Sequence, residues 1–93
     1  MSIALRVGDL YQLSVQERSA SKCEFCPWTL RKGSWRPEHG FVDVKPFQHG
    51  LLCVSILEEL TKWQGRDRTF KTGIFLVGEK FVGIGSDYIE VIQ

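Results

Sequence analysis

The chain has 93 residues, of which 43% are hydrophobic and 25% are charged. A chain of this length buries about two-thirds of its unfolded surface, which leaves room for one domain with one core, and the ordinary composition excludes a disordered or low-complexity polymer. Twelve basic residues balance eleven acidic residues, so no overall field draws the protein to nucleic acid or to membranes.

The compartment is indicated by the first residues and by the cysteines. Arg6 and Asp9 interrupt the apolar run at the start of the chain, and no segment is long enough for a signal sequence or a membrane-spanning helix. Three cysteines, an odd number, fit a reducing compartment better than a disulfide framework. We therefore expect a soluble cytoplasmic protein.

The first half of the chain predicts one strand followed by a long insertion. From residue 7 to residue 15, apolar and polar side chains alternate after a Gly-Asp turn, which is typical of a half-buried strand. Residues 16–49 lose this periodicity and contain many serines, prolines and glycines, as a long loop or an insertion with its own small structure would. Within it, residues 41–45 alternate briefly and stop at Pro46, which indicates a short edge strand.

Residues 51–63 fit two kinds of element. The spacing of Cys53, Ile56, Leu60 and Trp63 suits a helix, whereas the opening of the segment is rich in residues that favour strands. We expect a strand over residues 51–58, followed by a polar excursion from residue 61 to residue 69.

The last third predicts three short strands. Residues 72–77 and 80–84 are apolar and are joined by Gly78-Glu79, where glycine at the first central position is what a type II′ hairpin requires. A final strand covers residues 88–92. Five short strands in so small a chain favour a closed barrel or a rolled sheet, since closure removes exposed edges. The core side chains expected from strand alternation are Tyr11, Leu13, Val54, Ile56, Ile74, Leu76, Val82, Ile89 and Val91.

The order of these segments supports a resemblance. The series Val-Gly-Asp-Leu, Gly-Leu-Leu-Cys-Val, Gly-Ile-Phe-Leu-Val, Lys-Phe-Val-Gly-Ile-Gly and Ser-Asp-Tyr-Ile-Glu-Val-Ile resembles the small SH3-like barrels encoded by phages and mobile elements. The resemblance covers residues 6–15 and 50–92. It implies a single five-stranded SH3-like barrel over residues 1–93, with a one-turn 3₁₀ element at the Ser-Asp turn, and the insertion at residues 16–49 departs from the pattern.

A metal site is one hypothesis for the insertion. Cys23 and Cys26 form a C-x-x-C pair, and His39, His49 and Cys53 follow at distances that could complete a tetrahedral zinc site. No second such pair is present, so two small thiols in a loop, with Cys53 in the core, are the favoured interpretation, and a redox dithiol is less favoured still. We expect no metal and no cofactor, with zinc kept as an alternative.

Aromatic and basic residues alternate in two places. Such clusters can hold single-stranded nucleic acid by stacking and charge, or they can cap an apolar surface with indoles and aliphatic stems. The candidate binding residues are Trp28, Arg31, Lys32, Trp35, Arg36, Trp63, Arg66 and Arg68.

The expected function follows from these patterns. The sequence contains no motif of a nucleophile, a phosphate loop or a catalytic carboxylate pair, so we expect a non-catalytic binding or assembly module that contacts a protein partner or a second copy of itself. A nucleic-acid-binding barrel and a zinc-stapled domain remain as alternatives, and no membrane association is expected. The three tryptophans should not all lie in the core, because the strands already supply enough aliphatic residues to fill it.

Overall fold

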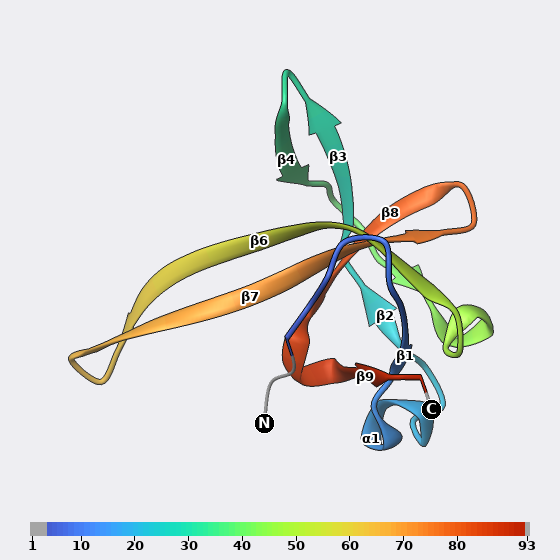
Figure 1. Cartoon of the computed structure of the whole chain (residues 1–93). Helices are drawn as coiled ribbons and strands as arrows, with labels where there is room; N and C mark the ends of the chain where they lie inside the picture. The colour runs from blue at the N-terminus through green and yellow to red at the C-terminus, as the bar shows by residue number, and fades with distance from the viewer. Residues whose placement is uncertain (1–3, 93) are drawn as a thin grey trace.

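A computed structural model describes residues 4–92, without the side chains of residues 59–63, 68 and 70. The chain forms a strongly twisted, mainly antiparallel β structure (Figure 1). Its elements are β1 (Leu10–Leu13), α1 (Val15–Arg18), β2 (Glu24–Phe25), β3 (Pro27–Arg31), β4 (Ser34–Pro37), β5 (Val42–Asp43), η1 (Lys45–Phe47), β6 (Leu51–Trp63), β7 (Arg66–Val77), β8 (Lys80–Gly85), η2 (Ser86–Tyr88) and β9 (Ile89–Val91).

The main sheet is open. Its seven strands follow the order β4-β3-β8-β7-β6-β1-β9, and β2 and β5 form a separate pair. Within the described residues, β4 and β9 end the sheet without meeting, so the prediction of a closed barrel is wrong, whereas the prediction of a mainly β fold is confirmed. The reason lies in the insertion, because β3 pairs with the free edge of β8 and extends the sheet where a barrel would close.

Residues 51–63 form one strand throughout. Strand β6 continues to Trp63 and β7 begins at Arg66, so the polar excursion expected at residues 61–69 is wrong. The two strands are joined by Gln64 and Gly65, whose φ angles of 52° and 74° are those of a type I′ hairpin turn. This turn has the right-handed twist of the flanking strands, which allows the pairing to continue to its end.

The C-terminal third matches its sequence pattern more closely. Gly78, at φ 62°, begins the two-residue turn between β7 and β8, which confirms the predicted hairpin. The Ser-Asp turn is the 3₁₀ element η2, as expected, and it leads directly into β9.

The core lies on one face of the sheet, which we call the inner face. Side chains from the sheet pack there against residues of the insertion and against Leu5 of the N-terminal segment. The buried cluster consists of Leu5, Tyr11, Leu13, Cys23, Val44, Leu51, Cys53, Phe75, Val77, Val82, Ile84 and Ile89, with Ala20, Phe25, Val42 and Ile56 packed against it.

The predicted core is only partly correct. Tyr11, Leu13, Ile74, Val82 and Ile89 are buried, Val54 and Ile56 are half-buried, and Leu76 and Val91 are exposed. A β-bulge between Cys53 and Ser55 changes which residues of β6 face inward, so Cys53 and Ile56 lie on the core side. In β7 the core residues are Phe75 and Val77, whereas Ile74 is buried outside the core cluster.

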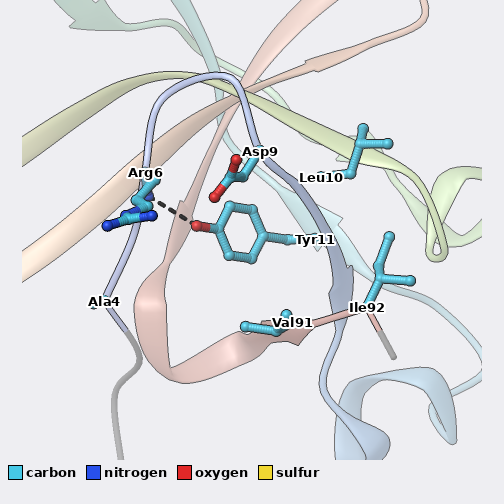
Figure 2. Close-up of a pocket in the computed structure, with 7 residues that line it drawn as sticks. All are labelled: Ala4, Arg6, Asp9, Leu10, Tyr11, Val91 and Ile92. Carbon is cyan, nitrogen blue, oxygen red and sulfur yellow. Dashed lines mark hydrogen bonds between the residues drawn. The ribbon is translucent and has the colours of Figure 1, made fainter.

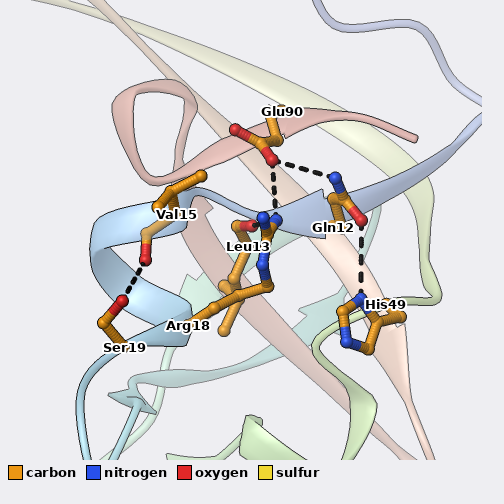
Figure 3. A network of polar contacts seen from close by, with 7 residues as sticks. All are labelled: Gln12, Leu13, Val15, Arg18, Ser19, His49 and Glu90. Atoms are coloured by element: carbon orange, nitrogen blue, oxygen red, sulfur yellow. Dashed lines mark hydrogen bonds and ion pairs between the residues drawn. The ribbon is translucent and has the colours of Figure 1, made fainter. Parts of the chain in front are cut away.

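A polar network attaches the short helix to the sheet (Figure 3). The guanidinium of Arg18 donates to Glu90 Oε1 and to the carbonyl of Leu13, both at 2.6 Å, and Gln12 Nε2 donates to the same carboxylate oxygen at 2.9 Å. Arg18 and Gln12 together lower the pKa of Glu90 from its ordinary value, mainly through the hydrogen bond from Arg18. The network thereby joins α1, β1 and β9 near the C-terminal edge of the sheet.

Candidate interaction surfaces

Two β-ribbons project from the sheet. Strand β3 pairs with β8 only at Pro27 and Trp28, so the rest of the β3–β4 hairpin extends beyond the sheet. Strands β6 and β7 likewise extend beyond the sheet, because β7 pairs with β8 only from Thr72 onward. We call residues 58–71 the long ribbon. Figure 1 shows that the hairpin and the long ribbon point in different directions.

The β3–β4 hairpin has two chemically distinct sides. Residues that are directly opposite in an antiparallel pair share a face, and successive residues of a strand alternate between faces. Trp28 is opposite Pro37, and Leu30 is opposite Trp35, which makes one side apolar. The other side is polar and consists of Thr29 opposite Arg36 and Arg31 opposite Ser34.

Both tryptophans of the hairpin are half-buried against β8. Trp28 lies over Gly83, where a Cβ would overlap the indole ring. Trp35 packs edge-on against Phe81, with ring centroids 5.1 Å apart and an interplanar angle of 72°. The absence of a side chain at Gly83 is therefore what allows the indole of Trp28 to approach the sheet.

A carboxylate binds the polar side of the hairpin. Glu38 Oε1 accepts a hydrogen bond from Thr29 Oγ1 at 2.8 Å and lies 3.6 Å from the guanidinium of Arg31. The carboxylate of Glu38 thus offsets part of the positive charge of the hairpin. Arg31 and Arg36 lie on the side of the hairpin away from the tryptophans.

The apolar side of the hairpin continues across the sheet. Successive pairs link one residue from each of six adjacent strands on the face opposite the core, which we call the outer face. These residues form the outer row: Leu10, Leu52, Leu76, Phe81, Trp28 and Pro37. Leu10 is 54% exposed and Leu76 is 37% exposed, and Leu30, next to the row on β3, is 55% exposed.

The outer row was not among the sequence-predicted site residues, apart from Trp28. Alternation within β3 and β4 around the Lys32-Gly33 turn, where both φ angles are positive, could have separated the apolar from the basic side of the hairpin. The rest of the row depends on which strands are neighbours, and residue pattern alone does not specify that order.

The two predicted basic and aromatic clusters lie on different ribbons. Trp28, Arg31, Lys32, Trp35 and Arg36 belong to the β3–β4 hairpin. Trp63 is opposite Arg66 in the register of the long ribbon, and Arg66 is exposed beside its turn, whereas the side chains of Trp63 and Arg68 lie outside the described part of the chain. Among the side chains that the structure describes, the two clusters therefore lie on separate ribbons.

The two thiols of the C-x-x-C pair differ in burial and in hydrogen-bond partner. Cys23 is buried in the core, and its Sγ donates to the carbonyl of Glu17 at 2.9 Å. Cys26 Sγ donates to the carbonyl of Glu38 at 3.0 Å. His39 and His49 are exposed, and the residues that the structure describes contain no group of three or more His, Cys, Asp and Glu side chains placed to hold a metal ion.

An open hollow of about 470 Å³ lies beside β1 and β9 (Figure 2). The hydroxyl of Tyr11 points across it and accepts a hydrogen bond from the backbone N–H of Arg6 at 2.8 Å. The lining combines one guanidinium and one carboxylate with apolar side chains, and it consists of Ala4, Arg6, Asp9, Leu10, Tyr11, Val91 and Ile92.

No helix in the described residues is long and apolar enough to cross a membrane, since α1 has four residues and each 3₁₀ helix has three. Comparisons with family models, with curated proteins and with solved structures gave no match to this chain.

Proposed function

We propose that the protein is a non-catalytic binding or assembly module that recognises another protein through its outer face, with Trp28 and Trp35 as anchors. The observation that carries the proposal is the outer row together with Leu30. These apolar side chains lie on the side of the sheet that the core does not use.

The energetic reason is the cost of exposed apolar surface. A sheet normally buries each apolar face against a second layer, and exposed apolar patches on small proteins commonly mark interaction sites. Binding hot spots are enriched in Trp residues set among apolar neighbours that exclude water. Trp35, held by Phe81 and bordered by the exposed Leu30, has this environment.

The distribution of charge supports a protein partner over nucleic acid. Binding to a phosphate backbone requires several basic side chains along one surface. Arg31 and Arg36 lie on the side of the hairpin away from its tryptophans, Arg31 is near Glu38, and Arg66 lies on the other ribbon.

Site-specific photo-crosslinking tests the proposal. A benzophenone amino acid replaces Leu30 on the outer face or, as the matched control, Phe41, which is 74% exposed and lies next to β5 outside the outer row. In cells that make the protein, we expect a discrete protein adduct from position 30 and none from position 41. In the position-30 variant, Trp35→Ala should weaken the adduct, because loss of an anchor typically costs about 2 kcal/mol or more of binding free energy.

Two results would contradict the proposal. An adduct at position 30 that nuclease treatment removes would favour nucleic acid as the partner. Equal labelling from positions 30 and 41 would show that the outer face has no preferred partner.

A further inference from the structure

We infer that the occupant of the outer face is a second copy of this chain, packed face to face in a two-fold dimer. The inference rests on the proposed function, because it specifies the partner of the same surface.

The area is sufficient for the centre of a dimer interface. Leu10, Leu30 and Leu76 are 54%, 55% and 37% exposed, and the other members are half-buried apart from the exposed Pro37. Together with Trp35 they leave on the order of 500 Å² of apolar surface uncovered, which is within the range of about 300–600 Å² for the largest and often functional patch of a small protein. A standard interface buries about 800 Å² on each partner and has an apolar centre within a polar rim. The row can supply that centre, and Gln12, Ser55 and Thr72 lie on the outer face near it to contribute to the rim.

The charge pattern favours a like partner. The outer row contains no ionisable side chain, so it offers nothing to attract a partner of opposite charge, and two copies can meet without like charges in contact. Arg31 and Arg36 lie on the other side of the hairpin and stay in water when the apolar side is covered. A two-fold contact uses the same patch twice, which requires a patch that is self-complementary in this way.

The geometry of a sheet is also compatible with a copy of itself. Two sheets pack face to face when their interdigitating side chains are apolar and when their twists match, and two copies of one sheet have the same twist. The exposed Leu30 and the half-buried Trp35 extend the apolar surface along the projecting hairpin, past the last pairing with β8. Each hairpin can therefore lie across the row of the other copy.

Sedimentation velocity on the purified full chain tests the inference. We expect the wild type to change from monomer to dimer with rising concentration, with a midpoint little altered by salt because the contact is apolar. Leu30→Glu should raise the dissociation constant at least about tenfold, since it places a charge on the apolar surface that the second copy would cover. Phe41→Glu, the matched control outside the row, should change the constant less than about twofold, and circular dichroism should show that both variants keep the wild-type fold.

Each outcome is decisive. A wild type that stays monomeric over the accessible concentration range would overturn the dimer, as would a dimer that Leu30→Glu leaves intact. A dimer that high salt dissociates would also overturn it, because charged groups would then hold the copies together. If the purified chain is monomeric while crosslinking at position 30 captures a different protein, the inference fails and the proposed function stands.

Discussion

The contact between Gly83 and Trp28 gives a direct test of the outer face. In the change Gly83→Ala, the three atoms nearest to the added methyl group would all belong to the indole of Trp28 and would all be closer than 3.0 Å. Real Cβ atoms essentially never have contacts this short. Trp28 is paired with Phe81 on one side and with Pro37 on the other, so its backbone has little freedom to retreat and the ring itself must move.

We expect this overpacking to lower the free energy of unfolding by about 1–3 kcal/mol. For a domain of this size the loss corresponds to a fall of roughly 5–20 °C in the thermal midpoint. Urea unfolding followed by far-ultraviolet circular dichroism measures the first quantity, and a thermal scan measures the second.

Gly50→Ala is the matched control for this substitution. No atom outside its chain neighbours lies within 4 Å of a Cβ built at Gly50, so its unfolding free energy should stay within about 0.5 kcal/mol of the wild type. In a Trp28→Ala background the cost of Gly83→Ala should largely disappear, because the two positions interact directly. A Gly83→Ala protein as stable as the wild type, or a cost that persists without the indole, would refute this packing of the hairpin.

Three further predictions concern the core, the polar network and the thiols. Phe75→Ala should cost about 3–5 kcal/mol of unfolding free energy, because Phe75 is fully buried. The neighbouring change Leu76→Ala should cost much less, because Leu76 is 37% exposed. Equal losses in urea unfolding would contradict the assignment of inner and outer faces. Arg18 lowers the pKa of Glu90 in the folded protein, so this carboxylate stabilises the fold above its ordinary pKa, and the contribution is lost as the pH falls through the lowered value. Glu90→Gln should therefore unfold with a weaker dependence on acidic pH than the wild type, and unchanged acid sensitivity would show that the ion pair is not linked to stability. In a titration with Ellman's reagent one thiol should react quickly, because burial raises the pKa of both Cys23 and Cys53. Cys26→Ser should remove this fast phase. Three thiols that react at equal rates would contradict the buried positions of Cys23 and Cys53.

The sequence predicts strands well where local signals are strong. Gly78 at the start of a two-residue turn, between two apolar runs, fixes the β7–β8 hairpin because few residues tolerate its positive φ. Alternation around Tyr11 and Leu13 likewise identifies β1 and its buried side.

The sequence fails where the outcome depends on non-local pairing. The bulge after Cys53 shifts the phase of β6 by one residue, and simple alternation has no means of detecting such a shift. The Gln64-Gly65 turn is a weaker signal than Asn-Gly, so the charged residues around it resemble a loop. The closed barrel is wrong for a similar reason, because β3 and β8 are far apart in the chain: Pro27 pairs with Val82, 55 positions later, and Trp28 pairs with Phe81, 53 positions later.

The same two strands, β6 and β7, cross from a packed sheet into a ribbon whose described pairings are only with each other. A two-stranded ribbon is marginally stable alone in water, so amide protons of residues 58–71 should exchange with solvent long before those near Cys53 and Phe75. The length of the ribbon can also change without altering the contacts of the core. Removing residues as opposed pairs, two pairs at a time, keeps the alternation of faces and the Gln64-Gly65 turn. Evolution or protein engineering can thus change how far the ribbon projects from the sheet without repacking the core.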